Sequence, residues 1–88
     1  MAMVDWLADR RVALISCDTW SFDPVPAENP ARPFEVPQTL NVRHNVVVAE
    51  NLALAELAAA DATEFMFVLS HARLRGATGA WIAPLAIV

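Results

Sequence analysis

The fold is decided by one stretch, Pro37-Gln38-Thr39-Leu40-Asn41-Val42-Arg43-His44-Asn45-Val46-Val47-Val48-Ala49-Glu50-Asn51-Leu52. Within it, residues 46–48 form a β-branched run without polar side chains, which predicts a buried strand. The carboxylate of Glu50 follows that strand, and an alanine- and leucine-rich helix is predicted over residues 52–60. Polar groups at the end of a strand that is supported by a helix are a common way to build a ligand site. We therefore expect the rest of the chain to support this strand.

The composition predicts a small domain with more apolar surface than it can bury. The chain has 88 residues, of which 57% are hydrophobic and 18% are charged, whereas typical soluble domains are about 45–50% apolar. A chain of this length buries only roughly 60–65% of the surface that it exposes when unfolded. The surplus indicates an interface with another subunit or with the rest of a larger domain. The alternative is a sequence that is simply rich in alanine.

Charge and cysteine content exclude several classes of protein. The net charge is −4 and no basic cluster is present, which argues against a nucleic-acid partner. The single Cys17 cannot form an internal disulfide and is typical of a reducing compartment. No apolar run approaches the ~20 residues of a membrane helix, and the charges over residues 5–11 interrupt any signal-peptide core. We expect a cytoplasmic protein without a membrane partner.

The order of the predicted elements is helix, strand, long loop, strand, helix, strand, strand. The pattern predicts a helix over 1–11, strands over 12–17, 64–75 and 81–88, and a turn over 76–79, in addition to the central strand and helix. Five of the six prolines fall in residues 19–37, which predicts an ordered arm or lid anchored by its aromatic residues. The fold class is therefore α/β (α+β), with a mixed sheet and packed helices.

No local motif for catalysis is present. The sequence lacks a glycine-rich phosphate loop, CxxC, GxSxG and HExxH. Ser70 and His71 are adjacent on a predicted strand, so they point to opposite faces and cannot act as a nucleophile–base pair.

The potential metal ligands also lack the spacing of a metal site; they are Asp18, Gln38, His44, Glu50 and His71. From the residues alone, Glu50 is interpreted more simply as an acidic residue at a helix N-terminus, where the helix dipole favours a negative charge. Gln38 would then be a loop amide, and His44 a surface histidine or one whose hydrogen bonds are satisfied within the protein. Metal binding is the alternative.

Three separated segments of the sequence favour metal binding over this simpler interpretation. Residues 12–21 form a strand that ends in Asp18-Thr19-Trp20, and residues 37–52 close in Glu50-Asn51-Leu52. Residues 65–68 form a strand, and the turn Gly76-Ala77-Thr78-Gly79 and a terminal apolar run follow it. Together, in order and spacing, they resemble the C-terminal part of the cyclase-type metal-dependent hydrolases, the family that contains kynurenine formamidase and isatin hydrolase. The resemblance spans nearly all 88 residues and implies the C-terminal portion of a swivelling β/β/α fold.

The resemblance implies a metal-dependent hydrolase that cleaves the C–N bond of an amide with an activated water. Glu50 corresponds to the family's glutamate at the metal centre, which makes it the expected catalytic base and a metal ligand. Gln38 corresponds to a position that is histidine in formamidase-like members, and glutamine there is similar to the isatin hydrolase branch. An amide oxygen is a hard, neutral ligand, so we expect Mn²⁺ first and Zn²⁺ second.

The resemblance also implies a small aromatic amide as the substrate, an isatin-like ring amide first and an aryl formamide second. The expected substrate-contacting residues are Trp20, Phe22, His44 and Trp81, since aromatic side chains form suitable walls for a flat ring. Core or interface packing is the alternative role of the aromatic residues.

One part of the family pattern is missing. The family's main metal-binding segment, His-x-Gly-Thr-His-x-Asp-x-Pro, has no counterpart in this sequence. We therefore expect residues 1–88 to be a single segment from the C-terminal part of such a hydrolase, inactive alone. Its expected partners are the N-terminal segment with the His and Asp ligands and further copies of itself. The alternative is a non-catalytic assembly module that retains half of the fold.

Overall fold

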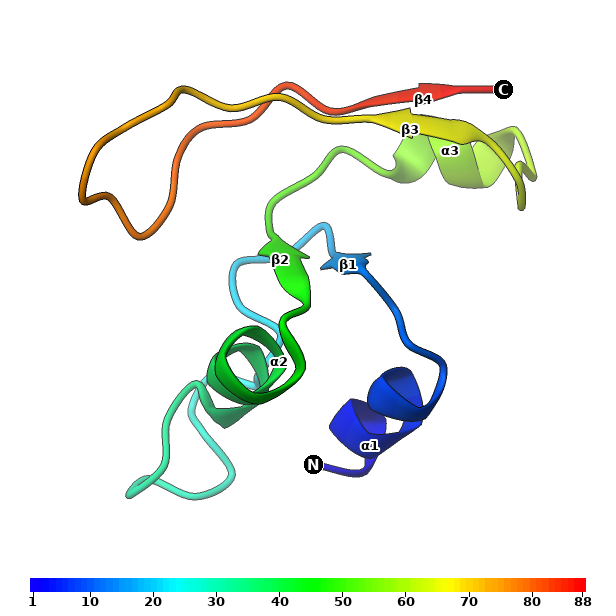
Figure 1. Ribbon diagram of the computed structural model, residues 1–88. Coiled ribbons are helices and arrows are strands. Elements are labelled where there is room, and N and C mark those ends of the chain that lie inside the picture. Colours follow the sequence, from blue (N-terminus) through cyan, green and yellow to red (C-terminus); the bar gives the residue numbers. More distant parts are fainter. The chain divides into compact units, whose positions relative to one another are not determined.

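The computed structural model describes residues 1–88 and shows a mixed α+β protein with three helices and two small sheets (Figure 1). The elements in chain order are α1 (Ala2–Asp9), β1 (Leu14–Ser16), α2 (Glu35–His44), β2 (Val47–Ala49), α3 (Ala55–Ala59), β3 (Met66–Val68) and β4 (Leu85–Ile87). They fall into two compact units, Met1–Ala53 and Leu54–Val88. None of the helices has the length and apolar character needed to cross a membrane.

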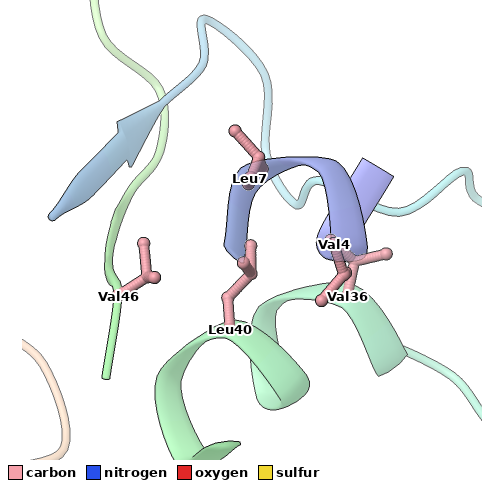
Figure 2. Close-up of a cluster of buried hydrophobic side chains, with 5 residues drawn as sticks. All are labelled: Val4, Leu7, Val36, Leu40 and Val46. Atoms are coloured by element: carbon pink, nitrogen blue, oxygen red, sulfur yellow. The ribbon is translucent and has the colours of Figure 1, made fainter. Parts of the chain in front are cut away.

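The hydrophobic core lies in the first unit (Figure 2). Val4 and Leu7 of α1 contact Val36 and Leu40 of α2, and Val46, just before β2, completes the cluster. The spacings of three and four residues place each helical pair on one face of its helix. This core therefore holds α1, α2 and the start of β2 together.

Helix α2 is a correction to the sequence analysis, which predicted a loop over 19–37 and no helix before β2. Pro37 is the third residue of α2, a position where the missing proline N–H costs no intrahelical hydrogen bond. The carboxylate Oδ2 of Asp23 accepts a hydrogen bond from the Val36 N–H at 3.0 Å and so caps the first turn. The helix ends at His44, and its C-cap residue Asn45 adopts the left-handed conformation (φ 55°) common at helix C-termini.

Strands β1 and β2 pair in parallel, with Leu14 opposite Val47, Ile15 opposite Val48 and Ser16 opposite Ala49. Further backbone hydrogen bonds extend the pairing, from Val47 N–H to the Ala13 carbonyl and from Cys17 N–H to the Ala49 carbonyl. The prediction of a buried central strand is only partly right, because Val47 is exposed while Ala49 is buried. Val47 and Ala49 lie on the same face of β2, so this face is covered at Ala49 and open at Val47.

The second unit contains α3 and the antiparallel pair β3–β4. The pairing joins Met66 to Ile87, Phe67 to Ala86 and Val68 to Leu85, and the bridge between His71 and Ile82 continues the same register. Both predicted strands occur in the expected places but are shorter than predicted, and α3 begins at Ala55 rather than at 52. Gly76 has a positive φ of 73° in the connection between the strands, consistent with the predicted turn there.

Candidate functional site

Glu50 lies at the carboxyl end of the parallel β1–β2 pair. It follows β2 directly and is half-buried, and Asp18 follows β1 at the same edge of the sheet. Ligand sites in parallel sheets form outside the carboxyl ends of the strands. The single ion pair of the chain joins Arg32 to Glu35, so the Glu50 carboxylate is not neutralised by a basic side chain. This edge is the candidate functional site.

The backbone after Glu50 is fixed to the segment that follows β1. Asn51 N–H donates to the Thr19 carbonyl at 3.0 Å, and Leu52 N–H donates to the Cys17 carbonyl at 2.9 Å. Asn51 adopts a positive φ of 57°, a conformation that asparagine tolerates better than most residues. These contacts hold Glu50 at the strand end. The simpler interpretation, an acidic residue at a helix N-terminus, is wrong because α3 begins only at Ala55.

Gln38 lies on the exposed side of α2 and not in a loop. Its Nε2 donates a hydrogen bond to the Pro33 carbonyl at 3.3 Å, which leaves the amide oxygen Oε1 available. It lines a shallow cavity of about 460 Å³, together with Ala31, Arg32, Pro33, Glu35, Thr39, Val42 and Arg43. Glu50 is not part of this cavity, so the cavity does not unite the two predicted metal ligands.

The predicted substrate-contacting residues have different surroundings. Trp20 is exposed, and its ring meets that of Phe34 edge to face, with 5.5 Å between the centroids. Phe22 packs against the hydrophobic core, and His44 is the exposed last residue of α2. Trp81 belongs to the second unit and is 97% exposed. None of the four lines the cavity beside Gln38, so their contact with a substrate stays a prediction.

The donors of this chain do not make a complete metal site. No group of three or more His, Cys, Asp or Glu side chains is close enough to hold a metal ion. Zinc sites need three or four protein ligands, and calcium or manganese sites use several oxygen ligands. Glu50 is therefore not part of such a group.

Two features of this unit were not predicted from the sequence. The first is Asp23, which caps α2 across the proline-rich segment. The second is the cavity face of α2, where Glu35, Thr39 and Val42 follow each other at helical spacing. The spacing of these three residues is visible in the sequence, but it indicates a common face only if residues 35–44 are recognised as a helix.

Comparison with known protein families, with curated proteins and with solved structures finds no match to this chain. The resemblance to the cyclase-type hydrolases therefore rests on the three sequence segments alone.

Proposed function

We propose that this chain is the C-terminal part of a cytoplasmic metal-dependent amide hydrolase with the swivelling β/β/α fold. It would act beside a polypeptide that contributes the His and Asp metal ligands. The observation that carries the proposal is the half-buried Glu50 carboxylate, without an ion-pair partner, at the carboxyl end of a parallel strand pair. A bound divalent ion, Mn²⁺ before Zn²⁺, would supply polarisation of the carbonyl and of a water molecule.

In this proposal Glu50 moves the proton of the reaction. Its carboxylate accepts a proton from the water that attacks the amide carbon, and it returns that proton to the nitrogen as the C–N bond breaks. The hydrogen bonds of Asn51 and Leu52 to the segment after β1 hold the backbone beside it in place. Half-burial limits the bulk water that competes for the same carboxylate.

Other residues of the chain would bind rather than react. The Oε1 atom of Gln38 accepts no hydrogen bond from the protein, since Nε2 makes the contact to Pro33, and it suits an oxygen-rich manganese site. Trp20 presents an exposed ring held in place by Phe34, which suits a flat aromatic amide such as isatin or, second, an aryl formamide.

The proposal is tested on the complex that the chain forms in its own cells. We expect native mass spectrometry with metal analysis to find a histidine-containing partner and a divalent metal. The purified complex should hydrolyse isatin or an N-formyl arylamine. Glu50→Gln should lower kcat by about 10²–10⁴-fold, the usual contribution of a general base.

The matched control is Glu56→Gln, the same change at an exposed position of α3, which should leave kcat unchanged. Equal activity of the Glu50→Gln complex and the wild-type complex would contradict the role of Glu50. Gln38→Ala should lower the metal content of the purified complex without removing the partner.

A second function is favoured by the exposure of the second unit. None of residues 54–88 is buried, which is the surface expected of a non-catalytic assembly module. A metal-free complex with no amide hydrolase activity would support this module and exclude the enzyme.

A further inference from the structure

The cavity beside α2 combines positive charge with an apolar wall. Its charged residues are Arg32, Arg43 and Glu35, so it carries a net charge of +1 in a chain whose net charge is −4. Three apolar residues also line it: Ala31, Pro33 and Val42. Its volume of about 460 Å³ lies within the range of small-molecule sites. Charge and lining together suit a small anion that has an apolar part.

The two arginines of this cavity differ in their partners. Arg32 forms the single ion pair of the chain, with Glu35, so these two charges neutralise each other. Arg43 lies in the last turn of α2 and has no carboxylate partner. The helix dipole favours a cation at this end of α2, but it does not use the planar fork of donors on the guanidinium. That fork matches the two oxygens of a carboxylate.

Thr39 adds a second polar group to the same side of α2. It precedes Arg43 by four residues, so the two side chains are neighbours on the helix surface. Thr39 is half-buried, and its hydroxyl makes no hydrogen bond with another group of the protein. The hydroxyl is therefore free to donate to an anion that Arg43 holds.

The loop side of the cavity is already fixed to the helix. Gln38 Nε2 donates to the Pro33 carbonyl at 3.3 Å, and the Arg32–Glu35 ion pair joins the loop to the first turn of α2. The loop itself is closed by a turn in which the Arg32 N–H donates to the Asn29 carbonyl at 2.9 Å. A site that is formed before binding loses less conformational entropy when a ligand enters.

We propose that this cavity binds a small organic monocarboxylate, with the carboxylate on Arg43 and Thr39 and the apolar part against Val42. The net charge of +1 favours a monoanion over a phosphate dianion. Val42 is 84% exposed, and a hydrocarbon group would remove this apolar surface from water, whereas inorganic phosphate would not. The inference does not rest on the proposed function, because it involves neither Glu50 nor a metal ion.

The test is an NMR titration of the purified 88-residue chain with sodium benzoate up to about 50 mM at constant ionic strength. We expect the amide signals of Thr39, Val42 and Arg43 to shift, with a dissociation constant on the order of 1 mM for a ligand of this size. Benzamide has the same shape without the charge and should bind at least about tenfold more weakly. Inorganic phosphate lacks the ring and should also bind at least about tenfold more weakly.

Variants identify the groups that hold the carboxylate. Arg43→Ala should raise the dissociation constant for benzoate at least about tenfold, because a charged hydrogen-bond donor is lost. Alanine is the best helix former, so α2 persists in this variant. Thr39→Val keeps the branched shape without the hydroxyl and should raise the dissociation constant at least about threefold. The matched control is Arg73→Ala, the same change at an exposed position of the second unit, which should leave it unchanged.

Several outcomes would overturn the inference. One is the absence of benzoate-dependent shifts at Thr39, Val42 and Arg43 up to about 50 mM. Another is binding of benzamide or phosphate as tight as that of benzoate, since the site would then not recognise a monocarboxylate. A third is an equal effect of Arg43→Ala and Arg73→Ala, which would indicate attraction by the charge of the whole chain and not by the cavity.

Discussion

Two asparagines, Asn45 and Asn51, set the limits of the segment that carries β2 and Glu50. Both adopt left-handed backbone conformations, with φ of 55° and 57°. An ordinary residue would pay about 1–2 kcal/mol for this conformation, whereas asparagine and glycine visit it readily. At Asn45 the chain leaves α2 and enters β2, and the Val46 N–H donates to the Leu40 carbonyl.

Substitution of Asn45 should separate backbone effects from side-chain effects. Asn45→Ala should lower the free energy of unfolding by about 1 kcal/mol, because alanine is strained in the left-handed region. Asn45→Gly should match the wild type or exceed it, because glycine adopts a positive φ without strain. Urea unfolding of the two variants measures both values. Equal loss in both would show that the side chain, and not the conformation, matters at this position.

Leu40 is the residue on which the core of the first unit depends most. It is fully buried between α1 and the start of β2 (Figure 2). Leu40→Ala should lower the free energy of unfolding by about 2–5 kcal/mol, since it removes buried methyl groups and leaves a cavity. Val42→Ala on the exposed side of the same helix should change it by less than about 0.5 kcal/mol. Thermal unfolding compares the two variants.

Helix α2 is the element that joins the proline-rich segment to the core. Its N-cap residue, Phe34, provides no side-chain hydrogen bond, and Asp23 supplies the cap from 13 residues upstream. Asp23→Ala should therefore lower the free energy of unfolding by about 0.5–2 kcal/mol, the usual value of a helix cap. Asp23→Asn keeps an acceptor oxygen and should retain most of that stability. Chemical unfolding of both variants decides whether this contact is a cap.

The sequence alone was insufficient to predict this helix. Pro37 suggested a loop, yet proline is tolerated in the first turn of a helix. Val36 and Leu40 are the only buried residues of α2, and most of its other positions are polar or exposed, so the helical period is weak. The acceptor that completes the first turn is distant in sequence, and no local pattern predicts it. Strands β1 to β4 were predicted because each contains an uninterrupted apolar run.

The candidate site was also predicted only in part, because apolar runs locate strands but not the contacts between elements. Glu50 was placed correctly at a strand end, because Val46 to Ala49 is an apolar run with a carboxylate after it. The environment of Gln38 was not predicted, since it depends on α2. Gln38 and Glu50 are twelve residues apart in the sequence. This spacing does not define whether their side chains meet, because side chains from different elements come together only through tertiary packing.

At the scale of the whole molecule, the two units differ in how they are stabilised. The buried residues all belong to Met1–Ala53, whereas Leu54–Val88 contains none. Opening of a segment costs less free energy where few apolar contacts are lost. The first unit should therefore be the more stable part of the chain.

Hydrogen exchange should show this difference directly. At low micromolar concentration we expect the amides of β3 and β4 to exchange at least about tenfold faster than those in the middle of α2, because no buried side chain protects the ribbon. Equal protection of the two regions in the dilute chain would contradict this account.

The closed loop between Asp23 and Phe34 has a practical consequence. Its two ends are held by the Asp23–Val36 hydrogen bond and by the Trp20–Phe34 ring contact. Lengthening a loop whose ends are already fixed costs only about 0.6 kcal/mol for each doubling. Glu28 and Asn29 are exposed, and a break between them leaves the Asn29–Arg32 turn intact. A reporter peptide can therefore be grafted there, which labels the chain without altering Glu50.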